Sequence, residues 1–319
     1  MSNAILEGLK KNGYSEKIVS ITKLSGDASS REYYRLELET KSAILSKEPV
    51  GGLQNIDFFK TTKLFRNHIN TPEIYFKSED STYLIQEDIG DVLFQQYYVE
   101  LNIESRKKIL EKVIDEILKY QSITIGEFKR HSSYEFDDEK IAFEFDLAYK
   151  FFVKEYLNGS INENSKHAIR ENFLRYFRDH KNVVCHRDMH SKNLMIKNNE
   201  ILNIDYQDAR TGPRCYDLVS FLEDCYFDYG EDLKEELKKY YFKKSNFKNY
   251  EDFEKEYSLV KCQRLFKALG SFAYLKIEKK KLGYEKYIGR TFENLRRELE
   301  KVSSYEEFTS ELRRAYYAN

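Results

Sequence analysis

The chain has 319 residues, enough for two lobes or domains that each bury a hydrophobic core. Charged residues make up 34% of the sequence but cancel to a net charge of −1, so no overall basic field indicates binding to nucleic acid or to an anionic membrane. No apolar run approaches the roughly 18 residues of a membrane span, residues 1–10 lack the apolar core of a signal peptide, and the four cysteines show no zinc-ligand spacing. We therefore expect a cytoplasmic protein with reduced thiols, and no protein partner can be read from the sequence.

The first part of the chain is predicted to be rich in β-strands. Short runs with β-forming residues and turn residues at both ends predict strands at 18–24, 33–39 and 42–47. The loop between the first two strands is small and turn-prone, with Gly26, Asp27, Ala28, Ser29 and Ser30. Two interpretations stay open from these residues alone: a plain hairpin turn, or a loop whose backbone approaches phosphates.

A helical pattern over 55–70 precedes two more predicted strands, at 73–77 and 82–86. Beyond residue 88 apolar residues recur at spacings of three and four, which is typical of amphipathic helices. These helices are predicted at 105–120, 140–157, 166–179, 216–226, 231–243, 252–280, 287–301 and 306–317. We therefore expect an α+β fold with a small, antiparallel, β-rich lobe at 1–88 and a larger, mostly α-helical lobe at 89–319.

The most informative stretch is the octet His186–Asn193, which follows a strand-like run at 183–185. After it, residues 194–197 and 201–204 form two apolar-rich runs separated by Asn198-Asn199-Glu200. Two such runs around a turn-prone tract predict a β-hairpin.

The register of that hairpin predicts a metal site. If the hairpin is centred on Asn199, Asn193 faces Asp205 at its open end, and opposed residues of an antiparallel pair lie about 4.5–5.5 Å apart. One divalent cation could then touch both side chains. Amide and carboxylate oxygens suit Mg²⁺, which also takes phosphate oxygens and water.

Asp188 lies five residues before Asn193, at the start of the loop that leads into the hairpin. This is the base position of the kinase pattern H-R-D-x-x-x-x-N, in which the Asn and a later Asp bind metal. Each of these residues alone would more often cap a turn. Their occurrence together favours phosphoryl transfer, with Asp188 accepting the proton of the acceptor hydroxyl.

The octet, together with Asp205–Ala209, resembles the aminoglycoside phosphotransferase and choline kinase superfamily. A closer resemblance, to the bacterial anomeric kinases of N-acetylmuramate and N-acetylglucosamine in cell-wall recycling, is carried also by Gly212-Pro213, Tyr216–Ser220, Gly26–Arg35 and Gln263–Gly270. The resemblance implies a protein-kinase-like two-lobe fold, ATP and Mg²⁺ as cofactors, and phosphate transfer to the C1 hydroxyl of an amino sugar. The alternatives are a kinase of an aminoglycoside, a choline-like amine or another small alcohol, and a nucleotide-binding pseudokinase. The complete set of Asp188, Asn193 and Asp205 speaks against a pseudokinase.

The resemblance also implies residues that bind the nucleotide. The loop of residues 26–30 would cover it, and the backbone at Glu87 and Ile89, in the segment that joins the lobes, would hydrogen-bond the adenine. Relatives often bind phosphates with a strand lysine paired to a helix glutamate. Lys47 is the candidate here, but it could equally be a solvated strand end with Ser46 at the phosphate position. Arg31 or Arg35 could supply the missing charge, or could equally form cross-strand contacts at the surface.

Acceptor recognition is assigned to polar residues around the two motifs. They are His190, Gln207, Asp208 and Arg210, with Gln263 and Arg264 reaching over from a later helix. His186 is expected to steady the catalytic loop and Asp217 to cap or brace backbone amides. An acidic tract would suit a cationic acceptor instead, although such a tract is usually a solvated helix face; it comprises Asp217, Glu223, Asp224, Asp228, Glu231 and Asp232.

Overall fold

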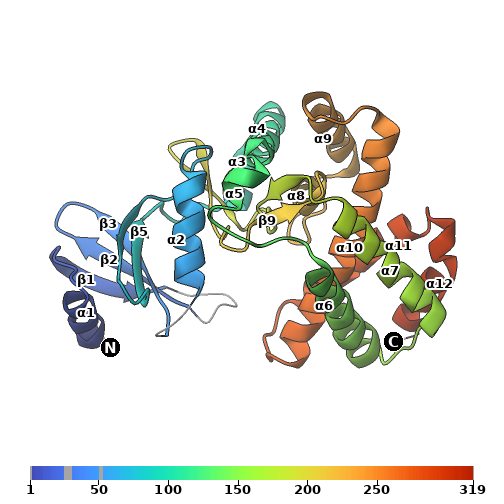
Figure 1. Ribbon diagram of the computed structural model, residues 1–319, viewed down its shortest axis with the longest axis horizontal. Helices are drawn as coiled ribbons and strands as arrows, with labels where there is room; N and C mark the ends of the chain where they lie inside the picture. Colours follow the sequence, from blue (N-terminus) through green and yellow to red (C-terminus); the bar gives the residue numbers. More distant parts are fainter. Residues whose placement is uncertain (1, 25–30, 50–52, 319) are drawn as a thin grey trace. The chain divides into compact units, whose positions relative to one another are not determined.

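The computed structural model describes residues 2–24, 31–49 and 53–318 (Figure 1). The chain divides into two compact units. Unit 1 comprises Met1–Asn102, Gly126–Ser133 and Lys192–Ala209, and unit 2 comprises Ile103–Ile125, Tyr134–Ser191 and Arg210–Asn319. The predicted lobes at 1–88 and 89–319 stay a prediction. The predicted nucleotide loop, Gly26 to Ser30, lies outside the described residues.

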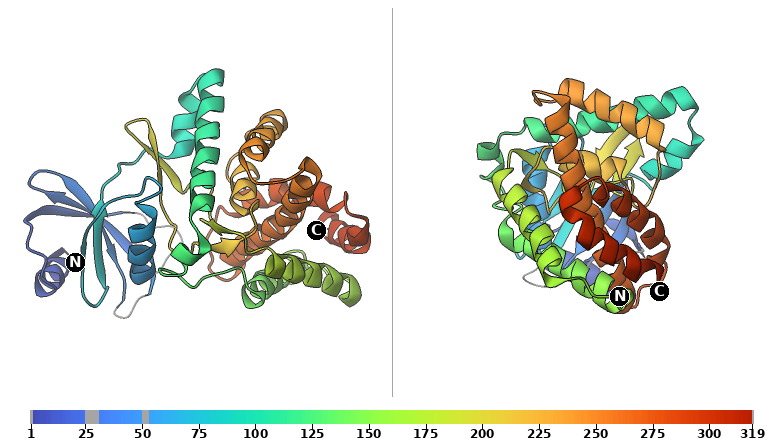
Figure 2. Two further views of the ribbon diagram at one scale, coloured as in Figure 1. Left: turned by 45° about the horizontal axis from the view of Figure 1, so that its top comes forward. Right: turned by 90° about the vertical axis from the view of Figure 1, so that its right-hand side faces the viewer.

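Unit 1 is built on a five-stranded antiparallel sheet. Its strands are β1 (Ile18–Lys23), β2 (Glu32–Leu38), β3 (Ser42–Lys47), β4 (Ile74–Lys77) and β5 (Tyr83–Glu87), in the order β1-β2-β3-β5-β4. Alternating apolar residues of this sheet pack on Ile5 and Leu9 of helix α1 (Ser2–Lys11). Helix α2 (Gln54–Phe65) covers the opposite face (Figure 1, Figure 2). All five strands predicted in this region are confirmed, whereas α1 was not predicted.

Unit 1 also contains helix α3 (Phe94–Glu100) and a hairpin of β7 (Leu194–Lys197) and β8 (Glu200–Asn203). Asn198 and Asn199 have positive φ of 52° and 62°, so they form a two-residue turn of the kind that requires left-handed backbone at both positions. Consequently Leu194 pairs with Asn203, and Asn193 accepts a hydrogen bond from the N–H of Ile204 (3.1 Å). The prediction that Asn193 faces Asp205 is therefore wrong by one residue, because the turn is tighter than a loop centred on Asn199.

Unit 2 is mostly helical (Figure 2). Its α-helices are α4 (Ile103–Ser122), α6 (Asp138–Ala148), α7 (Glu163–Asp179), α8 (Tyr216–Leu222), α9 (Glu231–Lys244), α10 (Tyr250–Ile277), α11 (Ile288–Leu299) and α12 (Glu306–Tyr317). Short 3₁₀ turns, η2 (Glu285–Tyr287) and η3 (Ser303–Tyr305), precede the last two, and α5 (Ile125–Phe128) starts at the end of one segment of this unit. Two short strands, β6 (Val183–Cys185) and β9 (Arg210–Gly212), pair antiparallel, and β6 leads directly into the octet.

The long helix α10 is the centre of unit 2, and it packs on α6, α8 and α11. At Gly270 the helices α10 and α6 approach so closely that an added Cβ would lie 2.3 Å from Cα of Ala148. Directly after Ala148, α6 continues as the π-helical turn η1 (Tyr149–Tyr156). The absence of a side chain at Gly270 thus sets the separation of the two helices that carry the polar cluster described below.

The α+β class predicted from the sequence is confirmed by this arrangement. All four cysteines are free thiols, and three of them, Cys185, Cys215 and Cys262, are buried. Within the described part of the chain, no helix combines the length and the apolar character needed to cross a membrane.

Candidate active site

The octet begins in a loop of unit 2 that is braced by one buried carboxylate. Both oxygens of Asp217, at the start of α8, accept backbone N–H bonds, from His186 (2.6 Å) and from Arg187 (3.0 Å). Arg187 has a left-handed φ of 79°, a conformation that a non-glycine residue keeps only when its surroundings hold it. The ring of His186 is fully buried and packs edge-on against Tyr120. These contacts fit the supporting roles predicted for His186 and Asp217.

Asp188, the predicted base, is surrounded by three cations of unit 2. Lys267 Nζ lies 3.5 Å and Arg264 Nη1 3.9 Å from its Oδ1, and Arg187 Nη1 lies 3.4 Å from its Oδ2. Burial alone would raise the pKa of this carboxyl, but Lys267, Arg187 and Arg264 outweigh it and hold the pKa well below the ordinary value. Asp188 is therefore ionised at neutral pH, as a group that orients and accepts a proton must be.

A second, buried carboxylate balances these cations. Glu144 of α6 lies 3.5 Å from Arg187 Nη2 and accepts a 3.0 Å hydrogen bond from the side-chain amide of Gln263. Burial would raise its pKa, but Lys267 and Arg187 lower it to about 2. For Lys267 the balance falls the other way: burial lowers its pKa to about 8, although Asp188 and Glu144 favour its charged form.

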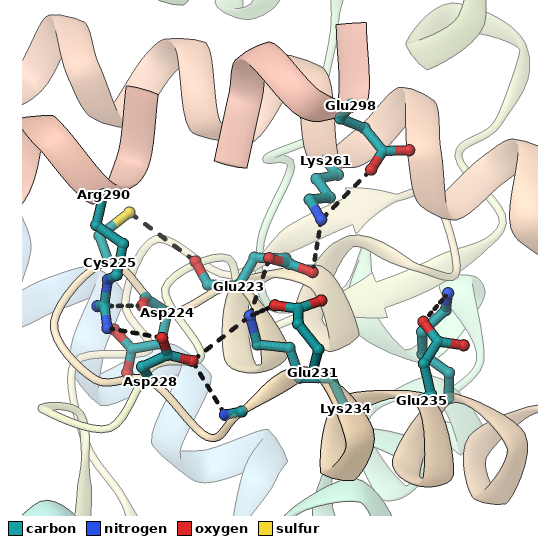
Figure 3. A network of polar contacts seen from close by, with 12 residues as sticks. Glu223, Asp224, Cys225, Asp228, Glu231, Lys234, Glu235, Lys261, Arg290 and Glu298 are labelled. Atoms are coloured by element: carbon teal, nitrogen blue, oxygen red, sulfur yellow. Dashed lines mark hydrogen bonds and ion pairs between the residues drawn. The ribbon is translucent and has the colours of Figure 1, made fainter. Parts of the chain in front are cut away.

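The acidic tract is neutralised within unit 2 (Figure 3). Glu223 is buried between Lys234 (3.5 Å) and Lys261 (3.0 Å), and the phenol of Tyr257 donates to it. Asp224 accepts hydrogen bonds from the backbone N–H and the hydroxyl of Ser191. The expectation of a solvated face is thus wrong for Glu223 and Asp224, since their side chains are buried as partners for lysines, a phenol and Ser191, while Asp217 is buried as a brace of backbone amides. Asp228 and Glu231 also pair with Lys234, whereas Asp232 is exposed.

In unit 1, the segment after β8 presents Asp205 in a strained backbone conformation, with φ of 63°. The next residue anchors it, because Tyr206 is fully buried against α2, with its ring stacked on Phe58 (4.9 Å) and its hydroxyl 2.9 Å from that of Thr62. Asp205 keeps a side chain that is 46% exposed, while its Oδ1 accepts a 2.7 Å hydrogen bond from Gln207. Positive φ at a non-glycine residue held by its surroundings is frequent at functional sites.

Asn193 and Asp205 offer an amide and a carboxylate oxygen at the open end of the hairpin. No group of three or more His, Cys, Asp or Glu side chains in the described chain could hold a metal ion by itself. Magnesium bound to a nucleotide takes one or two protein oxygens and completes its shell with phosphate and water. An amide and a carboxylate oxygen are donors of the kind that Mg²⁺ takes.

Ser46 and Lys47 are the two candidates for the strand position that would contact phosphates. The side chain of Ser46 is buried, and its hydroxyl donates to Asn55 Oδ1 (2.9 Å) at the start of α2. The carboxylate of Glu48 accepts a hydrogen bond from the backbone N–H of Asn55 (2.6 Å). Lys47 points to the other face, 3.6 Å from Glu32, and its side chain is 34% exposed. Ser46 and Asn55 thus form an uncharged buried pair, and the assignment of Lys47 to the nucleotide phosphates stays a prediction.

Arg31 is a buried cation in the same unit. Its side chain is 4% exposed, its Nη2 lies 3.5 Å from Asp205 Oδ1, and its guanidinium is over the ring of Tyr33. Arg35, the other candidate, is bonded to Asp88 (2.7 Å) and Asp91 (2.8 Å). Of the two arginines, Arg31 is the one beside a predicted metal ligand.

The segment predicted to bind adenine is anchored by side chains on both sides. Glu87 forms an ion pair with Lys197 (2.6 Å), which also donates to the carbonyl of Asp88 (3.1 Å). The side chain of Ile89 packs on Met195 and Leu202 of the hairpin. These contacts leave the predicted role of the Glu87 and Ile89 backbone untested, but they hold the segment in place.

The residues predicted to contact the acceptor fall into two groups. His190 and Arg264 lie against the catalytic loop: the N–H of His190 donates to the carbonyl of Asp188 (3.0 Å), and Arg264 is over the ring of Tyr216. Arg210 and Gln263 are buried in unit 2. The guanidinium of Arg210 lies over the rings of Tyr134 and Phe136, and the side-chain amide of Gln263 donates to Glu144. In unit 1, Gln207 and Asp208 form the turn after Tyr206.

A sequence model of the phosphotransferase enzyme family (APH) matches residues 20–255, about three quarters of the chain. The chain belongs to this family. As a phosphotransferase of this family, with kinases among its relatives, it is a small-molecule kinase.

Curated relatives of this APH-family chain carry one name. An N-acetylmuramate/N-acetylglucosamine kinase of Neisseria meningitidis serogroup B is 25% identical over 89% of this chain and 87% of that protein. One of the same name from Pseudomonas aeruginosa is 23% identical over 78% of this chain and 75% of that protein.

Solved structures of the same fold include two kinds of kinase. The ADP-bound aminoglycoside phosphotransferase APH(2'')-Ib superposes with a TM-score of 0.62, at 17% identity, over 92% of this chain and 97% of that one. Choline kinase LicA of Streptococcus pneumoniae gives 0.64, at 14% identity, over 92% and 98%. At such identities the likeness concerns the fold, and it confirms the predicted protein-kinase-like class of this APH-family chain.

Two residues of the site, Lys267 and Glu144, were not predicted. Lys267 follows Arg264 by three positions on one helix, so the spacing alone could have placed both on one face. Glu144 comes from a helix far away in sequence, and no local pattern signals its contact with the octet of this APH-family enzyme.

Proposed function

We propose that this chain is an ATP-dependent kinase that places the γ-phosphate on the anomeric C1 hydroxyl of N-acetylmuramate or N-acetylglucosamine. Two sets of findings support the proposal: the names of its curated relatives, and the charge around Asp188. The second is the observation that carries the choice of acceptor.

Three cations, Lys267, Arg264 and Arg187, approach Asp188. The two carboxylates among them are Asp188 itself and Glu144. A cationic amine brought to this carboxylate would meet an excess of positive charge, which at short range is unfavourable. The buried carboxylates of the acidic tract, Asp217, Glu223 and Asp224, are bonded to lysines and amides inside unit 2. A neutral or carboxylate-bearing sugar fits these surroundings better than an aminoglycoside or choline.

The proposed roles follow from the chemistry of phosphoryl transfer. Asp188 orients the acceptor hydroxyl and takes its proton as the sugar oxygen bonds to the γ-phosphorus and the bond from that phosphorus to the leaving ADP oxygen breaks. Asn193 and Asp205 would hold magnesium, which when bound neutralises the nucleotide phosphates. The braced loop and the three cations keep Asp188 ionised and oriented.

The test is ADP release with ATP, Mg²⁺ and four separate acceptors: N-acetylmuramate, N-acetylglucosamine, choline and kanamycin. We expect release with one or both sugars and none with the amines. Release with the amines alone would overturn the assignment of the acceptor, and the absence of release with all four would overturn the proposed activity.

The variant Asp188→Asn keeps the shape of the side chain and removes its negative charge. We expect it to lower kcat by at least about 100-fold, the usual range for a lost general base. The matched control is Asp179→Asn, at an exposed aspartate that ends α7. An Asp188→Asn variant with activity close to that of Asp179→Asn would rule out the role given to Asp188.

A further inference from the structure

Helix α10 places an ammonium group against the carboxylate of the proposed base. Lys267 Nζ lies 3.5 Å from Asp188 Oδ1, and only 14% of the Lys267 side chain is exposed. Arg264, one helical turn earlier, approaches the same oxygen at 3.9 Å, while Arg187 lies 3.4 Å from the other oxygen. The carboxylate of Asp188 is thus held through both oxygens by cations from two different elements.

Lys267 is itself held by the packing of its helix. Three residues further on, Gly270 lies in contact with Ala148 of α6, so the two helices cannot slide or separate without changing this contact. Four residues before Ala148, α6 carries the buried Glu144, whose negative charge favours the charged form of Lys267 as Asp188 does. A long, flexible lysine side chain is in this way confined to one position.

We propose that Lys267 is a positioning residue for the phosphoryl transfer: its charged ammonium fixes the carboxylate of Asp188 in the orientation that receives the acceptor hydroxyl. The inference rests on the proposed function. It adds that the reaction depends on the protonation of a lysine that is not part of the octet.

The charges that act on Lys267 come from Glu144 of α6, Arg187 and Asp188 of the catalytic loop, and Arg264 of α10. Further groups contact these residues: Lys140 and Gln263 contact Glu144, His190 acts on Asp188, and Tyr216 and Asp217 of α8 lie against Arg264 and the loop. The arginines stay charged at all relevant pH values, and the pKa values of Asp188 and Glu144 are lowered, so both are already ionised. Burial raises the pKa of Asp217 to about 7, against the two amides that donate to it, and that of Tyr216 far above the alkaline range.

The direction of the pH effect follows from the sign of the shift at Lys267. Its pKa is lowered from 10.5 to about 8, so the ammonium is present below that value and is lost as the pH rises through it. Loss of the charge removes one of the three cations from Asp188 while both arginines remain. Activity should therefore fall on the alkaline side with a midpoint near 8.

The kinetic test compares Lys267→Met, Lys267→Arg and the control Lys255→Met, an exposed lysine on the same helix. Against pH, kcat/KM of the wild type and of the control should fall with a midpoint near 8. Lys267→Met should be roughly 100-fold less active at neutral pH, the typical effect of a misplaced catalytic group, and should lack this midpoint. Lys267→Arg should recover most of the activity and keep it to higher pH. A midpoint near 8 that persists in Lys267→Met would overturn the inference.

A second measurement does not depend on turnover. The ¹³C resonance of the Asp188 side-chain carboxyl, assigned with Asp188→Asn, should move with a midpoint near 8 in the wild type and lose that inflection in Lys267→Met. An inflection that is absent from the wild type, or present in Lys267→Met, would refute the coupling. The two failures can be told apart: a wild type that phosphorylates none of the acceptors overturns the proposed function, whereas an active wild type without this inflection overturns the inference alone.

Discussion

Arg31 illustrates how a single buried charge bears on nucleotide binding. The phosphates of ATP carry several negative charges, which magnesium neutralises only in part, so a kinase needs a further cation. Lys47 is partly exposed beside Glu32, and Ser46 is bonded to Asn55, whereas Arg31 is buried next to Asp205. A guanidinium in this position can form two parallel hydrogen bonds to phosphate oxygens.

From this comparison we predict that Arg31→Met raises KM for ATP by about tenfold or more, the loss expected for one charge-assisted hydrogen bond. Lys47→Met, the matched removal of a cation that lies nearby in the sequence, should change KM for ATP by no more than about twofold. Steady-state kinetics at saturating acceptor measure both. A larger effect from Lys47→Met than from Arg31→Met would restore Lys47 as the phosphate ligand.

At this scale the sequence left open which of Lys47 and Ser46 faces α2, and the structure shows that Ser46 does. Whether the odd-numbered or the even-numbered residues of β3 face α2 depends on how the sheet packs. The sequence of the strand alone does not contain that information. Asp188, His186 and Asp217 could be predicted because they lie within short sequence motifs. No role could be predicted for Lys267, because its contact with Asp188 joins residues almost eighty positions apart.

At the scale of elements, the hairpin that follows the octet shows that strand register was harder to predict than the strands themselves. Both strands were predicted, yet the register was wrong by one residue, because a turn of two asparagines with positive φ is shorter than the three-residue tract suggested. The helix predicted over 216–226 ends at Leu222. There Asp224 accepts the N–H of Tyr226 (2.7 Å), a local side-chain bond that competes with the helix, and also binds Ser191.

The crossing of α6 and α10 gives a prediction about stability. An alanine at 270 would place Cβ 2.3 Å from Cα of Ala148, so the helices must move apart. We expect Gly270→Ala to lower the free energy of unfolding by about 1–3 kcal/mol, the usual range for overpacking. It should also lower kcat, because α10 carries Lys267 and Arg264.

Gly289→Ala in α11 is the control for that change. There an added Cβ would meet only the hydroxyl of Tyr316 at an ordinary 3.6 Å, and alanine is the better helix former. Urea unfolding should show this variant to be as stable as the wild type or more stable. If Gly270→Ala were equally harmless, the close crossing would not be what positions the two helices.

At the scale of the whole molecule, composition and periodicity were sufficient for the fold class and for most helices. They could not show that the chain forms two interleaved units, with residues 192–209 belonging to the first and the octet's residues up to Ser191 to the second. Such interleaving depends on long-range packing, which leaves no periodic signal. Helices α1 and α3 were missed for a related reason, since both are short.

The charge of the whole chain is nearly neutral, but its distribution within unit 2 is not random. Carboxylates of the acidic tract are paired inside, while the base is surrounded by cations. Acceptor choice therefore depends on the local charge around Asp188, and the net charge of −1 of the whole chain has no bearing on it. It predicts a sugar acceptor in a fold that is shared with kinases of aminoglycosides and choline.

The most direct test of that claim is the ³¹P spectrum of the product that the wild-type protein forms from ATP, Mg²⁺ and N-acetylglucosamine or N-acetylmuramate. The account predicts a phosphomonoester signal whose coupling and correlation connect phosphorus to the anomeric proton. A phosphomonoester correlated with a proton of any other ring position, or no new phosphomonoester with either sugar, would contradict it.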